Sequence, residues 1–557
     1  LKKALENYNN ATVSQTSLFN DITIAKVETQ VFLAFLLKKS AQDYTETLNQ
    51  AMEMYDKLLN QNNINNERFF RIKGCIYLVN GKFNDSINEF NNAIDNFPKN
   101  ASVAKFFKSK VYREQQKLTE AINILKEASL NDQESAFIYN ELGDIYLAQK
   151  LYDYSIPFFK EAIKINKIYP DPHANLAYCY LKIEKDNYTN NDILEEAKIA
   201  IKLNPELALA QYILGLAYIK KDDTIQAIEA FQTAIKLNPN YIEAHSKLSY
   251  LYNLTGKTED AISEAKIALK IRPDFAEAHF NLGMVYYRDN ETKSKAIDEF
   301  NIGLSFDRES LDGHLNLGKI LLKEKKYNEA LTEFKEVVRL KPKVAEYRFY
   351  LADIFEKIGN EQNAIIEYQK TISLDNNYLL AHANLAEIYR NQLKIEESID
   401  EYLEAIRLKN SDATYYYGLA NCYYQIGRIE ESIFNYKKAI ELNNNYFDAL
   451  FDLGYVYLNK YAYENATIQF SEATRVKPLS SESHNALGIA YYYQDKISLA
   501  ITEIEKAIKL RYNYSEAHYN LGLALEKSER ITASTNEFQI ACKLGYSLAC
   551  SKNSEIN

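Results

Sequence analysis

Histidine is the residue type in this chain with the widest chemical options, because an imidazole can bind a metal, act as a base or respond to pH near neutrality. The 557-residue sequence holds seven histidines. All seven lie at one position of a recurring pattern: His173, His245, His279, His314, His382, His484 and His518. Neighbours in such a series are separated by one repeat, on the order of 10 Å, whereas a metal needs ligand nitrogens about 2 Å away. The spacing argues against a shared metal site.

We expect these histidines to be partly buried spacers that pack between neighbouring repeats. Phe70, Tyr139 and Tyr416 hold the same position in other repeats and are expected to do the same. An alternative is that the histidines titrate together near their unperturbed pKa of about 6.5, so that protonation loosens the stack in mild acid.

No other motif predicts catalysis. GKT at 256–258 is similar to the end of a phosphate-binding loop, but the glycine required five residues earlier is Leu251. Gly256 is predicted to be a turn between two helices. The same prediction holds for Gly81, Gly359 and Gly427. No metalloprotease, calcium-loop or nucleophile-elbow motif is present. We therefore predict no enzyme activity, and no catalytic, cofactor-binding or metal-binding residue.

The elements that position these residues follow a period of 34 residues, which divides 67–548 into fourteen units. In each unit, apolar residues recur at helical spacing in two stretches with a short turn between them. The eighth position is always small, and position 24 is aromatic in ten units. Position 27 is alanine in eleven units, and position 32 is proline in six. Large residues opposite small ones at fixed offsets are typical of two close antiparallel helices.

This pattern resembles the tetratricopeptide repeat, which has a small residue at position 8, Tyr at 11, Ala at 20 and 27, an aromatic residue at 24 and Pro at 32. The resemblance covers 67–548, nearly the whole chain. It implies an all-α fold, an α-solenoid of stacked antiparallel helix pairs that form a right-handed superhelix. It also implies a concave groove lined mainly by the first helix of each pair.

The ends of the chain are less regular. Residues 1–66 are predicted to be degenerate or partial helical repeats: LKKALENYNNA at 1–11 matches the second helix of a repeat, and 22–60 holds two amphipathic helices. Residues 549–557 are predicted to be a tail or the start of a capping helix. We infer from these ends a piece of a longer protein, or a processed one.

The groove positions of the first helix vary from unit to unit while the framework stays nearly constant, which is expected of a recognition surface. An alternative is that the variation is merely tolerated on a solvated face. Position 5 offers large rigid rings at Tyr212, Phe280, Phe349, Tyr417, Phe451 and Tyr519. Position 6 offers amides, which can donate to and accept from a peptide unit, at Asn175, Asn281, Asn316, Asn384 and Asn520. In long members of the family, such an asparagine ladder grips extended peptide backbone, but Ile213, Lys247 and Tyr350 interrupt it here.

Cys542 and Cys550, in ACKLGYSLAC, resemble the cysteine spacing of Sel1-like repeats. That resemblance implies a possible disulfide, with free thiols as the alternative. A disulfide would favour an oxidising compartment such as a periplasm.

The composition narrows the class of partner. A net charge of -10 with interleaved charges argues against nucleic-acid binding. The most apolar run, VFLAFLL at 31–37, is too short to cross a bilayer, which takes roughly 20 residues. We therefore expect a non-enzymatic scaffold that binds proteins or peptides, within or outside a multiprotein assembly. Two alternatives stay open: a substrate-recruiting arm of a larger enzyme, and an architectural part of a bacterial envelope complex. The compartment is open between periplasm or envelope and cytoplasm.

Overall fold

The computed structural model describes residues 16–39, 43–61, 67–183, 188–288 and 292–556. In this described part every regular element is helical, with 31 α-helices, one short 3-10 helix and no strand. The predicted all-α solenoid of antiparallel helix pairs is confirmed. The helix predicted over 1–11 lies outside the described residues. The chain divides into two compact units, Leu1–Phe306 and Asp307–Asn557.

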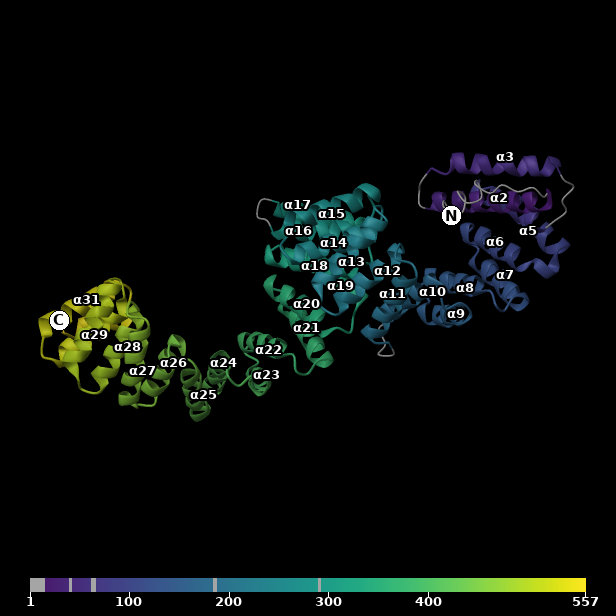
Figure 1. Ribbon diagram of the computed structural model, residues 1–557. Helices are drawn as coiled ribbons and strands as arrows, with labels where there is room; N and C mark the ends of the chain where they lie inside the picture. The colour runs from purple at the N-terminus through teal and green to yellow at the C-terminus, as the bar shows by residue number, and fades with distance from the viewer. Residues whose placement is uncertain (1–15, 40–42, 62–66, 184–187, 289–291, 557) are drawn as a thin grey trace. The chain divides into compact units, whose positions relative to one another are not determined.

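The first unit is a series of helical hairpins that follow one another in chain order (Figure 1). Its helices are α2 (Thr16–Lys39), α3 (Thr45–Gln61), α4 (Glu67–Val79), α5 (Phe83–Asn96), η1 (Pro98–Asn100), α6 (Ser102–Glu114), α7 (Leu118–Asn131), α8 (Ala136–Ala148), α9 (Tyr152–Ile165), α10 (Pro170–Lys182), α11 (Asn190–Leu203), α12 (Ala208–Lys220), α13 (Thr224–Leu237), α14 (Ile242–Leu254), α15 (Thr258–Ile271), α16 (Ala276–Arg288) and α17 (Lys293–Phe306). The two helices expected within 22–60 are α2 and α3.

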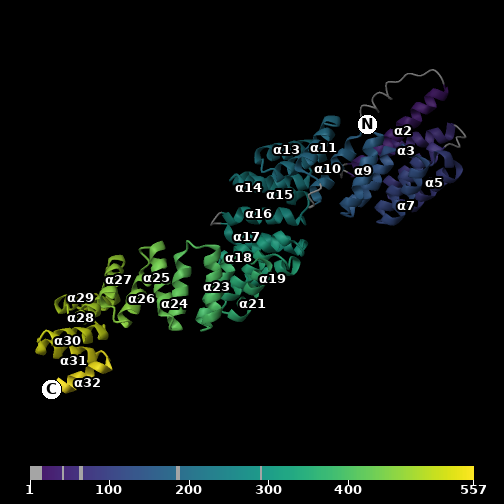
Figure 2. The same ribbon diagram turned by 90° about the horizontal axis from the view of Figure 1, so that it is seen from below.

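The second unit continues the same alternation, and a second view shows the same order of hairpins (Figure 2). Its helices are α18 (Leu311–Lys323), α19 (Tyr327–Leu340), α20 (Ala345–Lys357), α21 (Glu361–Leu374), α22 (Leu379–Asn391), α23 (Ile395–Leu408), α24 (Ala413–Gln425), α25 (Ile429–Leu442), α26 (Phe447–Asn459), α27 (Tyr463–Val476), α28 (Ser481–Tyr493), α29 (Ile497–Leu510), α30 (Ser515–Lys527), α31 (Ile531–Lys543) and α32 (Ser547–Ile556). From α4 to α31 we call the even-numbered helices first helices and the odd-numbered ones second helices.

Seven hairpins are locked by a glycine of the first helix under a phenylalanine ring of the second. A methyl group added at Gly454 would lie 2.5 Å from Cε1 of Phe470, whose side chain is fully buried. Seven repeats share this glycine and phenylalanine pairing: Gly74 with Phe90, Gly143 with Phe159, Gly215 with Phe231, Gly283 with Phe300, Gly318 with Phe334, Gly454 with Phe470 and Gly522 with Phe538. The glycine is kept because only a residue without Cβ lets the helices approach so closely.

The turn inside a hairpin needs one residue in the left-handed region of backbone conformation. Gly81, Gly256, Gly359 and Gly427 hold it with φ of 73° to 77°. This confirms their prediction as turns, and Gly256 is therefore not part of a phosphate loop. Eight other hairpins place a residue with a side chain in the same conformation, among them Lys325 and Leu393.

No helix within the described ranges is both long and apolar enough to span a membrane.

Candidate peptide-binding face of the first helices

The predicted asparagines lie along the first helices, and Asn175, Asn281 and Asn520 bridge to the preceding first helix. The side-chain amide of Asn281 on α16 donates to the carbonyl oxygen and to the hydroxyl of Ser246 on α14, both at 2.9 Å. The amide of Asn520 on α30 donates to Oδ1 of Asn485 on α28 at 3.0 Å. The donor half of each amide therefore joins neighbouring hairpins.

Two further asparagines use their donors in the same manner. Asn175 donates to Oδ1 of Asp144 at 2.7 Å, and Asn384 donates to the hydroxyl of Tyr368 at 2.9 Å. Asn316 is half-buried on α18. In the four bonded asparagines, Oδ1 accepts no hydrogen bond from the described residues, and none of these oxygens is sealed from solvent without a partner. These four asparagines thus use their donors within the fold, and their side-chain oxygens remain available as acceptors.

The predicted aromatic residues form the floor of this face rather than projections from it. Tyr417 packs against Tyr436 of its own hairpin at 6.0 Å between ring centroids, and against Tyr446, which precedes the next first helix, at 5.0 Å. Tyr212 and Phe280 are only 8 % exposed. Equivalent ring contacts are made by Tyr212 with Tyr241, Phe280 with Phe300, Phe349 with Tyr378, Phe451 with Phe470, and Tyr519 with Tyr546. Most of each ring face is occupied within the chain.

Three consecutive repeats of the second unit differ from the others in a way that sequence reasoning missed. They carry tyrosine instead of phenylalanine under the first helix, and alanine instead of glycine opposite it. The pairs are Ala352 with Tyr368, Ala386 with Tyr402 and Ala420 with Tyr436. The paired change from Gly and Phe to Ala and Tyr was a readable signal in the sequence.

The three hydroxyls reach polar side chains of the first helices. Tyr368 donates to Glu356 at 2.7 Å and Tyr402 donates to Glu387 at 2.8 Å. Tyr436 donates to the carbonyl oxygen of the Asn421 side chain. Burial raises the pKa of Glu356 above its usual range. The hydroxyls fix the rotamers of these polar groups, so that the face is preorganised.

Asp452 on α26 gives the same region negative charge. It accepts a hydrogen bond from the Tyr417 hydroxyl at 2.9 Å. Burial, with the Asp448 carboxylate adding to it, raises the pKa of Asp452. The face of the first helices between α20 and α26 therefore carries carboxylates held by neutral hydroxyl donors.

The seven histidines do not converge on a common centre. In each case Nδ1 lies 2.5 to 2.7 Å from a glutamate Oε2 on the second helix of the same hairpin. In six of them Nε2 also lies 2.7 to 3.2 Å from a carbonyl oxygen at the end of the preceding repeat. These imidazoles therefore lie between neighbouring repeats, as expected, and in addition bind the second helix of their own hairpin. Among the described residues no group of three or more His, Cys, Asp or Glu side chains could hold a metal ion.

Cys542 and Cys550 are joined in a disulfide, with Cα atoms 4.8 Å apart. The bond links the end of α31 to α32, so the last helix is held against the array. Buried Phe538, Ala541 and Ala549 form the core of this end. The other cysteines, Cys75, Cys179 and Cys422, are free.

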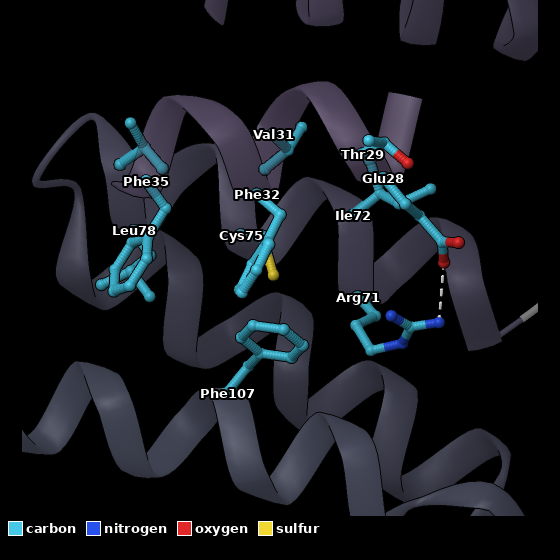
Figure 3. A pocket seen from close by; sticks show the side chains of 11 residues that line it. Glu28, Thr29, Val31, Phe32, Phe35, Arg71, Ile72, Cys75, Leu78 and Phe107 are labelled. Atoms are coloured by element: carbon cyan, nitrogen blue, oxygen red, sulfur yellow. Dashed lines mark hydrogen bonds and ion pairs between the residues drawn. The ribbon is translucent and has the colours of Figure 1, made fainter. Parts of the chain in front are cut away.

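A cavity of about 340 Å³ lies between α2, α4 and α6 (Figure 3). Its walls are mostly apolar side chains, including Phe32, Phe35 and Phe107. At one end Arg71 is neutralised by Glu28, with 2.8 Å between Nη2 and Oε1. Nothing in the structure shows what covers this cavity.

The hairpins, their small-under-aromatic locks and their recurring polar positions define an α-solenoid built from one repeat type. Family models described as tetratricopeptide or TPR repeat match 73–171, 208–290, 315–378, 387–460 and 485–543, together more than half of the chain. The chain belongs to the tetratricopeptide repeat family. Such repeats support protein interaction, and the chain is a protein-interaction scaffold. The Sel1-like character of the C-terminal end stays a prediction.

Solved structures with similar folds include three that differ in the length they match. "Crystal structure of YrrB: a TPR protein with an unusual peptide-binding site" is 20 % identical, with 35 % of this chain and 97 % of that chain covered and a TM-score of 0.31. "Human IFIT1 dimer with PPP-AAAA" is 16 % identical, with 70 % and 93 % covered and a TM-score of 0.42. "MamA 41-end from Desulfovibrio magneticus RS-1" is 20 % identical, with 30 % and 96 % covered and a TM-score of 0.29. A comparison with curated proteins finds no match.

Proposed function

We propose that the chain is a non-enzymatic scaffold that binds extended segments of partner proteins along the face of its first helices. Fourteen repeats between residues 67 and 548 would form this scaffold, flanked by the helices of 1–66 and by α32. Family membership supports the general function. Preformed helices present their contacts without an ordering step, which favours binding by many weak interactions.

One observation supports the proposal: four asparagines of the first helices donate hydrogen bonds within the chain, while their side-chain oxygens accept none from the described residues. Asn520 donates to Asn485, which in turn donates weakly toward Glu516 at 3.5 Å. The orientation of each amide is thereby fixed, with Oδ1 of Asn520 at the open end of the chain of hydrogen bonds. A fixed acceptor beside a first helix suits the N–H of an extended peptide, whatever its side chain.

The surroundings of Asn520 fit such a ligand. A cavity of about 30 Å³ between α28 and α30 is lined by Asn520, Ile489, Tyr492 and Leu523, among others. It is too small for a ligand of its own, but suits a methyl-sized part of a bound segment. A backbone contact with a shallow apolar hollow beside it is the combination that an extended peptide requires.

A peptide array probed with the full chain tests this proposal. Asn520→Ala and Asn384→Ala remove one acceptor each, and we expect each to weaken retained peptides about fivefold, since one hydrogen bond contributes about 1 kcal/mol. Asn328→Ala, on the exposed side of second helix α19, is the matched control. Far-UV circular dichroism verifies that all three variants fold. Unchanged binding by both groove variants would remove these amides from the function.

A specific observation favours one of the alternatives, an architectural part of a bacterial envelope complex. The Cys542–Cys550 bond persists only where thiols are not kept reduced. Alkylation of the intact protein in its native cells, before and after reduction, reports the state of this pair. Two thiols free without reduction would oppose the envelope assignment and leave the peptide-binding proposal untouched.

A further inference from the structure

Six of the seven histidines lie between two hydrogen-bond acceptors, an arrangement that we call the histidine clasp. In the clasp of His279, Nδ1 is 2.7 Å from Glu299 Oε2, and Nε2 is 2.9 Å from the carbonyl oxygen of Pro273. The other clasps are His245 with Glu264 and the Pro239 carbonyl, His314 with Glu333 and the Arg308 carbonyl, His382 with Glu401 and the Asn376 carbonyl, His484 with Glu503 and the Pro478 carbonyl, and His518 with Glu537 and the Tyr512 carbonyl.

The partners of the clasp determine its charge. A carbonyl oxygen can only accept, so Nε2 must carry a hydrogen. An ionised carboxylate can also only accept, so Nδ1 must carry one as well. A neutral imidazole has one N–H and would leave one short contact without a proton. Only the imidazolium cation satisfies both contacts.

One repeat has arginine at the histidine position, bound to the same two acceptors. Arg348 occupies the histidine position of its repeat, and its Nε donates to the Pro342 carbonyl at 2.8 Å. Its Nη1 donates to Glu367 Oε2 at 2.8 Å. The two acceptors are 6 and 19 residues away in sequence, as they are in the clasps of His245 and His382. Arginine, which is always charged, therefore makes the two contacts that the imidazolium makes in the histidine clasps.

The sequence pairs the two sides of the clasp from repeat to repeat. Every repeat with histidine or Arg348 at the clasp position has glutamate at the facing position of the second helix. Where the clasp position is neutral in charge, four of five repeats lack that glutamate: Tyr139 faces Phe158, Gln211 faces Ala230, Tyr416 faces Asn435 and Leu450 faces Gln469. In the fifth, Phe70 faces Glu89, which pairs instead with Lys73 at 2.7 Å. In the remaining repeat Lys105 holds the clasp position and faces Ile124, and this lysine pairs with Glu127 at 3.4 Å. The facing glutamate therefore accompanies histidine and arginine at the clasp position and is not a fixed part of the frame.

The surroundings of the rings favour positive charge. Burial disfavours the cation of His279, but hydrogen bonds to Glu299 and to the Pro273 carbonyl outweigh it, so the pKa is raised. The same balance raises the pKa of His245 and of His382, and Glu404 adds to the effect on His382. The charged groups that act on these three rings are all glutamates. The aromatic neighbour of His279 is Phe306, with 5.8 Å between ring centroids, and it does not titrate.

We propose that the histidine clasps are a pH-sensitive lock that holds these hairpins closed as imidazolium–glutamate pairs and releases them when the imidazolium loses its proton. Because the folded state binds the protons of His245, His279 and His382 more tightly than the unfolded chain does, their stabilisation is complete below the unfolded pKa of about 6.5 and is lost as pH rises through the folded pKa. This sign is opposite to the sequence-based alternative, in which protonation loosens the stack. Mild acid tightens the hairpins.

The first test is a pH titration of the seven histidine Cε1–H signals by NMR in the full chain, labelled at histidine Cε1. His173 contacts Glu196 at 2.6 Å, but its buried Nε2 has no acceptor among the described residues, so it lies outside the clasps. Single His→Phe variants assign the signals, since Phe70 shows that the position accepts phenylalanine. We expect His245, His279 and His382, whose pKa values are raised, to titrate above pH 6.5. Midpoints of all three at or below pH 6.5 would overturn the proposal.

The second test separates charge from packing. Urea unfolding midpoints are measured between pH 6 and pH 9 for the wild type, for a variant with Arg at all six clasps and for one with Phe at all six. We expect the wild-type unfolding equilibrium constant to rise by up to tenfold per clasp for each pH unit above 6.5. At every pH, the urea midpoint of the Arg variant should equal the midpoint that the wild type has at pH 6. The urea midpoint of the Phe variant should be lower and should not change with pH.

Single substitutions localise the effect. Glu299→Gln keeps an acceptor near His279 but removes the charge, so the His279 midpoint should fall while other signals stay in place. Glu472→Gln removes an exposed partner of Arg475 in a repeat that has Leu450 at the clasp position; it is the control and should move no histidine signal. A wild-type midpoint that is level or rises with pH, or an unmoved His279 signal in Glu299→Gln, would refute the lock.

Discussion

The contact between Gly454 and Phe470 allows one packing prediction to be followed from coordinates to free energy. A Cβ at position 454 would lie 2.5, 2.7 and 2.9 Å from three atoms of the Phe470 ring. Ordinary carbon contacts are about 3.5–4.0 Å, so the ring would have to retreat by roughly 1 Å. It has little room, because Phe470 is fully buried and its centroid lies 5.2 Å from that of Tyr455.

The expected free-energy change of Gly454→Ala combines two opposing effects. Overpacking destabilises a core by about 1–3 kcal/mol, whereas alanine stabilises a helix interior by up to about 1 kcal/mol relative to glycine. We therefore expect a net loss of about 1 kcal/mol in the free energy of unfolding. In a Phe470→Leu background the clash is removed, and the same Gly454→Ala change should stabilise by a few tenths to about 1 kcal/mol.

The assay is urea unfolding followed by far-UV circular dichroism for the wild type, the two single variants Gly454→Ala and Phe470→Leu, and the double variant. Hydrogen exchange of α26 and α27 locates the effect. The change of sign is the decisive result, because helix propensity alone gives the same sign in both backgrounds. If Gly454→Ala stabilises the wild-type chain as much as it stabilises Phe470→Leu, the close-approach explanation of the repeated glycines is wrong.

Three further predictions rest on separate contacts. Leu393→Gly should stabilise the second unit by about 0.5–1 kcal/mol, because Leu393 is 75 % exposed and its backbone is held in the left-handed region at φ 60°. Gly359→Ala should destabilise the unit by a similar amount, because Gly359 is held at φ 77°. Thermal unfolding measures both changes. Reduction of Cys542–Cys550 should lower the stability of the α31–α32 end by about 2–3 kcal/mol, read as faster hydrogen exchange in α32, and Cys542→Ser should be insensitive to reductant. Glu141→Gln should lower the free energy of unfolding by about 2 kcal/mol, because the buried carboxylate binds Lys110 and Arg113, which hold its pKa low against burial. In the wild type this stabilisation should be lost as pH falls through the pKa of Glu141. Acid titration of the variant should not show that dependence.

The fold could be predicted closely because each framework position has the same structural role in every repeat. Small residues such as Gly454 recur where a second helix must approach, and glycines such as Gly359 recur where the backbone turns. A period of 34 residues sampled many times makes these constraints visible in a single sequence. The division near residue 306 could not be predicted, because no change of composition marks it.

The candidate site could be predicted only in part. The asparagine positions were identifiable, because an amide repeated on one helical face stands out. The hydrogen bonds from Asn281 to Ser246 could not be predicted. Whether a side chain binds an internal partner or a ligand depends on distances of a few tenths of an ångström. The aromatic residues show the same limit. Their position in the repeat predicted the helix and the face on which they lie. It did not predict that a ring such as that of Tyr417 is enclosed by two neighbouring rings.

The histidines show how a position between repeats can be predicted while the side chain that binds there is missed. Position alone placed all seven on the first helix and excluded a common metal centre. The duty depends on a second position, where Glu299 and its equivalents face the imidazoles across the hairpin. Comparison of repeats within the chain holds that signal, since Arg348 takes the same slot with the same glutamate while Tyr416 faces an asparagine. A repeat array is in this respect its own alignment: correlated changes between its copies, such as Gly and Phe with Ala and Tyr, report contacts that a single copy cannot.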